Sequence, residues 1–174
     1  MSSSTVIKAA LERNARAIAA RPSIAQGTAV TRITLHPGLA CDVEEGPWRF
    51  KVGMTDKYGG ENTGPNPGVY GRAALGSCLA MGYAMWAARL DISVRSLAVE
   101  VRARYDARGE LAIDDSVRPG YADIVYVVTI DTDAPDADVH RMLDLADRHS
   151  SWLDDLRNPV PVSREVRIVR GEPA

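Results

Sequence analysis

The sequence has little cysteine and no clustered metal ligands. Its 174 residues include only two cysteines, Cys41 and Cys78, which are poor material for a structural disulfide in a reducing compartment. Neither lies in a Cys-x-x-Cys pair or in a cluster of cysteine and histidine with the spacing of a zinc site. We therefore expect no structural zinc, no other metal site and no stabilising cross-link.

The sequence also lacks an excess of charge and a long hydrophobic run. Its 21 Lys and Arg residues are balanced by 23 Asp and Glu residues, and the basic residues are scattered, so nothing indicates a nucleic acid or an anionic membrane as partner. Residues 1–23 mix charges into their apolar positions, unlike a signal peptide, and no later segment is long enough to span a bilayer. We expect a cytoplasmic protein with no nucleic-acid or membrane partner.

The chain length predicts one domain, residues 1–174, with residues 1–22 as an N-terminal helical extension. Apolar residues recur three to four positions apart between residues 3 and 20, which is typical of an amphipathic helix. Residues 28–52 are rich in β-forming residues interrupted by two tight turns. This pattern predicts two or three antiparallel strands, one of which contains Cys41.

A loop rich in glycine and proline precedes the most apolar helix of the chain. Asn66 is a good capping residue, and Pro67 suits the first helical turn. The helix should run to about Leu90, and its residues are apolar or small almost all round, which indicates a buried central helix. Cys78 lies about three turns into this helix.

The C-terminal half predicts strands on either side of a further helix. Residues 97–107 and 122–131 alternate between apolar and polar, as half-buried strands do. A helix should begin after Asp133-Ala134-Pro135 and carry Ser150 on its inward face, and residues 160–170 alternate again as a closing strand. Helices segregated from antiparallel strands make this an α+β fold.

Several motifs together resemble the OsmC/Ohr family of thiol peroxidases. They are GPNP at residues 64–67, AALGSC at 73–78, HSS at the end of the later helix, and PVPV at 159–162. The resemblance covers about residues 28–170 in element order. It implies an intertwined homodimer in which antiparallel sheets wrap around long central helices, with active sites at the subunit interface and no cofactor.

The resemblance also implies a reaction. The helix cysteine of active members attacks an organic hydroperoxide and becomes a sulfenic acid, which a second cysteine resolves before small dithiols or lipoylated proteins reduce the protein. By position, Cys78 matches the attacking thiol, and Ser150 stands in the place of the resolving cysteine. The Asn-Pro pair lacks the glutamate that follows it in the family. Arg32 and Arg49 are the candidates for stabilising the thiolate.

The chemistry of a thiol leaves two hypotheses open. The dipole of its own helix acts only within the first turn and cannot activate Cys78, and burial would raise the pKa of this thiol unless a guanidinium reaches it. In the first hypothesis, Cys78 reduces hydroperoxides as a single cysteine and an external thiol reductant restores it.

In the second hypothesis, the chain is a homodimeric small-molecule binding protein that holds an apolar ligand without catalysis. Cys78 is then a core thiol and Ser150 a capping hydroxyl. The apolar cluster of Met81, Met85 and Trp86 fits either hypothesis, as core packing or as the wall of an apolar pocket.

Overall fold

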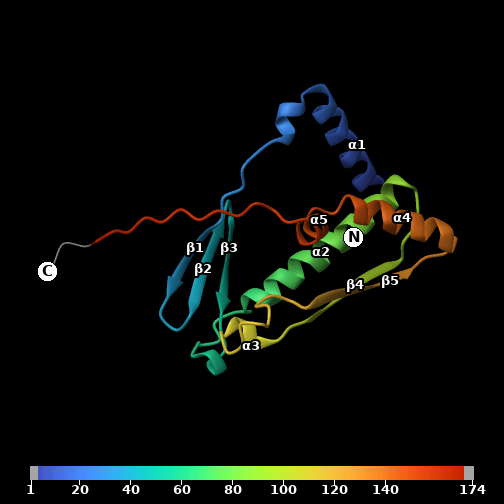
Figure 1. The fold of residues 1–174 in the computed structure, drawn as a ribbon. Coiled ribbons are helices and arrows are strands. Elements are labelled where there is room, and N and C mark those ends of the chain that lie inside the picture. Colours follow the sequence, from blue (N-terminus) through green and yellow to red (C-terminus); the bar gives the residue numbers. More distant parts are fainter. Residues whose placement is uncertain (1–3, 171–174) are drawn as a thin grey trace.

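The computed structural model describes residues 4–170 and combines helices with two separate antiparallel sheets (Figure 1). The helices are α1 (Ser4–Ala20), α2 (Pro67–Arg89), α3 (Ala107–Glu110), α4 (Asp136–Arg148) and α5 (Ser151–Arg157). The strands are β1 (Arg32–His36), β2 (Ala40–Glu45), β3 (Trp48–Gly53), β4 (Ser96–Arg104) and β5 (Asp123–Asp131). The predicted α+β class is confirmed.

The long helix α2 begins where the sequence predicts. The Asn66 side chain accepts a hydrogen bond of 3.1 Å from the backbone N–H of Val69, and Pro67 occupies the first turn, where its missing N–H costs nothing. The helix ends at Arg89, one residue before the expected end. Within residues 4–170, neither α2 nor any other helix has the length and apolar character that crossing a membrane requires.

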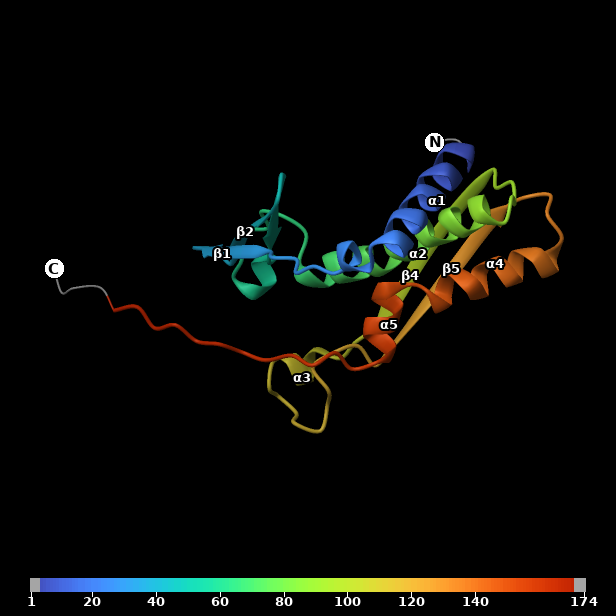
Figure 2. The same cartoon turned by 90° about the horizontal axis from the view of Figure 1, so that it is seen from above.

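The core forms where α2 packs on the β4–β5 ribbon and on α4, with α1 on another side (Figures 1 and 2). Strands β4 and β5 pair antiparallel along their whole length, from Ser96↔Asp131 to Arg104↔Asp123. Both predicted strands are thus confirmed. The fully buried side chains Leu75, Leu79 and Tyr83 recur every four residues on α2 and form its inward stripe.

The sheet β1-β2-β3 lies beside the body of the molecule and is joined to it by loops (Figure 1). It fulfils the prediction of antiparallel strands in residues 28–52, and Cys41 lies in β2 as expected. Much of its apolar surface is exposed to solvent: the side chain of Ile33 is 60% exposed and that of Leu35 is 65% exposed.

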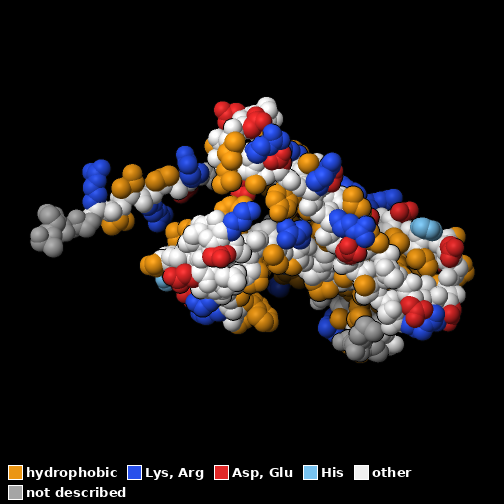
Figure 3. Space-filling view, turned by 90° about the horizontal axis from the view of Figure 1, so that it is seen from below, with side chains coloured by type: hydrophobic (Ala, Val, Ile, Leu, Met, Phe, Trp, Pro, Cys, Tyr) orange, Lys and Arg blue, Asp and Glu red, His pale blue; other side chains and the backbone are white. Residues whose placement is uncertain are grey.

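Two expectations about the C-terminal part are not met within the single chain. The helix that should carry Ser150 ends at Arg148, because the chain turns there and Ser150 becomes the N-cap of a separate helix, α5. The Ser150 side chain is nevertheless buried, as expected. Residues 159–170 form no strand, since none of the strands of this chain pairs with them. This tail leaves the body as an exposed segment on which hydrophobic and charged side chains alternate (Figure 3).

Candidate active site

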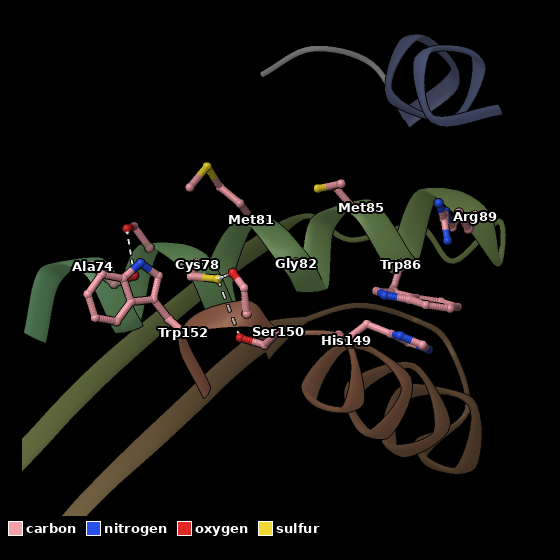
Figure 4. Close-up of a pocket in the computed structure, with 13 residues that line it drawn as sticks. Ala74, Cys78, Met81, Gly82, Met85, Trp86, Arg89, His149, Ser150 and Trp152 are labelled. Carbon is pink, nitrogen blue, oxygen red and sulfur yellow. Dashed lines mark hydrogen bonds between the residues drawn. The ribbon is translucent and has the colours of Figure 1, made fainter. Parts of the chain in front are cut away.

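Cys78 is half-buried on α2 and faces the start of α5 (Figure 4). Its Sγ lies 3.5 Å from Oγ of Ser150 and 3.8 Å from Oγ of Ser151. The structure therefore brings together the two residues that the sequence singled out, although they are 72 positions apart.

The Ser150 hydroxyl has a defined direction because it is also the cap of α5. Its Oγ accepts a hydrogen bond of 3.4 Å from the backbone N–H of Leu153, and the residue is only 6% exposed. A hydroxyl has one hydrogen to donate. With its oxygen engaged by the helix, this hydrogen is available to the sulfur of Cys78.

The surroundings of Cys78 lower the pKa of its thiol. Burial acts in the opposite direction, but it is outweighed by hydrogen bonds from the Ser150 hydroxyl, the backbone N–H of Trp152, and the hydroxyl and backbone N–H of Ser151. All these donors come from the first turn of α5 or its cap, where unpaired N–H groups favour a negative charge. From the sequence, a guanidinium is the group considered able to lower this pKa, whereas in the structure the lowering comes from hydrogen bonds at the beginning of a second helix.

A pocket of about 740 Å³ opens beside the sulfur. Met81, Met85 and Trp86 line it, as one interpretation of the sequence expects (Figure 4). At its far end the ring of His149 stacks on Trp86, with centroids 5.3 Å apart, and the guanidinium of Arg89 lies 5.1 Å from the centre of the Trp86 ring. Small residues of α2 and α4, together with the cap and first turn of α5, complete the lining: Ala74, Ser77, Gly82, Ala146, Ser150, Ser151 and Trp152.

The two arginines proposed from the sequence do not line this pocket. Arg32 lies in β1, and Arg49 in β3 forms a surface ion pair of 3.2 Å with Glu44. Both belong to the three-stranded sheet, so their role as thiolate partners stays a prediction. Cys41 is half-buried in the same sheet and lies outside the pocket as well.

Sequence reasoning missed the donors of α5 and the pair formed by Trp86 and His149. A serine that precedes a short amphipathic run is a signal for a helix cap, and Ser150 before Ser151–Arg157 fits it. No local signal in the sequence places that cap against Cys78, whereas the family resemblance does so, because Ser150 stands in the place of the resolving cysteine. Among residues 4–170, no group of three His, Cys, Asp or Glu side chains is arranged to hold a metal ion.

The chain belongs to the family of OsmC-like proteins, because the model of that family matches residues 60–165. The match begins after the three-stranded sheet and includes the loop before α2, Cys78 and Ser150. No curated protein matches the sequence.

Solved structures of OsmC-like proteins share the fold. An OsmC-like protein from Mycoplasma pneumoniae has a TM-score of 0.66 at 11% identity, over 77% of this chain and 90% of that one. An organic hydroperoxide resistance protein from Elizabethkingia anophelis has a TM-score of 0.57 at 14% identity, over 77% and 91%. An organic hydroperoxide resistance protein OsmC from Legionella pneumophila has 0.55 at 16%, over 76% and 90%.

Replacing Ser150 by alanine should raise the pKa of Cys78, because the thiolate loses the hydroxyl that stabilises it. At neutral pH a smaller fraction of the thiol is then ionised, and alkylation of Cys78 slows. The rate of alkylation by iodoacetamide as a function of pH measures this pKa. Ser77→Ala is the matched control, since the Ser77 hydroxyl lines the pocket but bonds to the carbonyl of Ala74. An equal shift in both variants would contradict the assignment.

Proposed function

We propose that the protein reduces organic hydroperoxides with Cys78 as its single reacting thiol. The observation that carries this proposal is the contact of the Cys78 sulfur with the cap and first turn of α5, which lowers the pKa of the thiol. A thiol attacks peroxides as the thiolate. Membership of the OsmC-like family and the names of the Elizabethkingia and Legionella proteins support the same chemistry.

The first step is a displacement at oxygen. The thiolate of Cys78 attacks the terminal oxygen of the hydroperoxide, the S–O bond forms as the O–O bond breaks, and the alkoxide leaves and takes up a proton. The balance is one thiol and one hydroperoxide converted into one sulfenic acid and one alcohol. The apolar side chains Met81, Met85 and Trp86 supply a surface for the organic part of such a substrate.

The second step uses a thiol from outside the chain. Ser150 cannot form a disulfide, and the other cysteine, Cys41, lies on the separate sheet. The sulfenic acid therefore condenses with an external thiol, which releases water and leaves a mixed disulfide. A second external thiol then attacks this disulfide and restores Cys78 while the two reductant molecules end as a disulfide. This cycle needs a reducing compartment, and we place the protein in the cytoplasm.

We also propose that a second copy of the chain completes the fold. Ile33 and Leu35 on β1, and Val162 and Ile168 on the tail, are each 60% exposed or more in the protomer. Exposed apolar surface that gathers on strands marks an interaction site. Apolar and polar residues alternate along residues 160–170 as they do in a half-buried strand. We propose that this segment packs against the sheet of the second copy.

Replacing Cys78 by serine should abolish hydroperoxide consumption, because no thiolate remains. Cys41→Ser should retain it, because Cys41 lies outside the pocket. Consumption of cumene hydroperoxide with excess dithiothreitol measures both. Loss in both variants would make Cys41 a participant. A wild-type protein that binds cumene hydroperoxide without consuming it would favour the alternative function as a binding protein for apolar ligands.

Replacing Ser150 by cysteine should convert the cycle to one with an internal disulfide. The native Oγ lies 3.5 Å from the sulfur of Cys78, so a small rotation brings the new sulfur into bonding distance. Mass spectrometry after a short peroxide pulse should find the disulfide in this variant and sulfenic or sulfinic acid in wild type. A Cys78 that stays a plain thiol in both proteins contradicts the proposed function.

The dimer is tested by light scattering combined with two substitutions in the tail. The wild-type protein should have the mass of two chains. Val162→Asp should shift the equilibrium to monomers, because a charge on the buried face of a strand is costly. Ser163→Asp adds the same charge on the opposite face of the strand and should leave the dimer intact. A stable wild-type monomer at micromolar concentration excludes the dimer.

A further inference from the structure

Behind the pocket, the carboxylate of Asp147 joins three elements of the fold. Its Oδ1 accepts a hydrogen bond of 2.6 Å from the hydroxyl of Tyr83 on α2, and its Oδ2 accepts one of 2.6 Å from the hydroxyl of Tyr126 on β5. Asp147 itself belongs to the last turn of α4. The two tyrosines thus hold the end of α4 against both the central helix and the sheet.

Asp147 is also part of the turn that delivers Ser150. Its backbone carbonyl accepts a hydrogen bond of 3.3 Å from the N–H of Ser150, at the point where the chain leaves α4 and enters α5. Tyr83 lies five positions after Cys78 on α2. The side chain of Asp147 therefore ties the turn before α5 to the same helix that carries the reacting sulfur.

Neither local helix stability nor solvation explains a carboxylate at this place. The C-terminal end of a helix carries partial negative charge and disfavours an acidic side chain. Tyr83 is only 1% exposed, so its hydroxyl has given up water for this one acceptor. Burial is the main cause that raises the pKa of both tyrosines, and the hydrogen bond to Asp147 is the second. Both hydroxyls therefore stay protonated and act as donors.

We propose that Asp147 is a positioning residue for Cys78. Through Tyr83 and Tyr126 it holds the turn between α4 and α5 so that the Ser150 hydroxyl and the first N–H groups of α5 stay against the sulfur. The proposal rests on the proposed function only for the identity of Cys78 as the reacting thiol.

A direct effect of the Asp147 charge on Cys78 would act in the opposite direction. The groups bonded to the carboxylate are the hydroxyls of Tyr83 from α2 and Tyr126 from β5. The guanidinium of Arg157 from α5 acts electrostatically on both tyrosines. A negative charge near a thiol raises its pKa, so removing the charge alone would lower the pKa of Cys78. Removing a positioning contact lets the Ser150 hydroxyl and the N–H groups of α5 move away from the sulfur, which raises the pKa of Cys78. The sign of the change therefore separates the two effects.

The experiment measures the pKa of Cys78 in a Cys41→Ser background, where it is the one remaining thiol. Tyr83→Phe and Tyr126→Phe each remove one donor without a change of charge. Asp147→Asn keeps the shape of the side chain but leaves an amide that accepts at its oxygen only. Asp144→Asn is the matched control, because Asp144 is exposed on the same helix.

We expect the pKa of Cys78 to rise by about half a unit to one unit in Tyr83→Phe, Tyr126→Phe and Asp147→Asn, which slows alkylation near neutral pH about three- to tenfold. Asp144→Asn should leave it unchanged. Circular dichroism and the midpoint of thermal unfolding verify that each variant is folded. Tyr126 is only partly buried, so Tyr126→Phe is the variant to rely on if Tyr83→Phe or Asp147→Asn unfolds.

Folded variants with an unchanged pKa of Cys78, or with a pKa that falls in Asp147→Asn, overturn the positioning role. Alkylation requires no peroxide turnover, so this test stands apart from the proposed function. If the wild-type protein fails to consume hydroperoxides while the variants show the expected pKa changes, the proposed peroxidase activity is refuted and the positioning role of Asp147 stands. If hydroperoxides are consumed but the pKa of Cys78 is unchanged in the variants, the peroxidase activity stands and the positioning role of Asp147 is refuted.

Discussion

The packing of α2 against the β4–β5 ribbon is the interaction on which the rest of the structure depends. Leu75, Leu79 and Tyr83 bury one stripe of the helix, and burial of each large side chain contributes about 1.5–3 kcal/mol. Gly76 permits α2 to approach strand β4 closely, since a Cβ at this position would lie only 3.1 Å from Cγ2 of Val101. This packing fixes the rotation of α2. Cys78, next to the buried Leu79, is thereby held at the edge of the core, where α5 can reach its sulfur.

The sequence predicts those parts of the fold that are determined locally. Asn66 followed by Pro67 marks the start of α2, and the alternation of residues 122–131 marks a strand, because both signals lie within a few residues. The approach of Ser150 to Cys78 has no local signal. It depends on where α4 ends, and a helix of seven residues such as α5 is too short for its periodicity to be distinguished from a continuation of α4.

The hydroxyl of Ser150 has two contacts in the structure. The family resemblance places Ser150 near Cys78, and the second hypothesis gives its hydroxyl a capping role. The structure shows both at once, since the hydroxyl caps α5 and its Oγ lies 3.5 Å from the sulfur of Cys78. The same atom cannot be lost without a cost to helix stability, which for an N-cap is about 0.5–2 kcal/mol. Reactivity and local stability are therefore coupled at this one residue, and neither could be assigned from the position alone.

The three-stranded sheet has a thermodynamic consequence. With β1 exposed along its whole length, the sheet buries few of its own apolar side chains, chiefly Ala40 and Val43. A small antiparallel sheet is stable in water only when its hydrophobic face is covered. Its folding free energy must then come largely from the surface that covers it. If that surface is another copy of the chain, folding becomes a second-order process, and the midpoint of thermal unfolding rises with protein concentration.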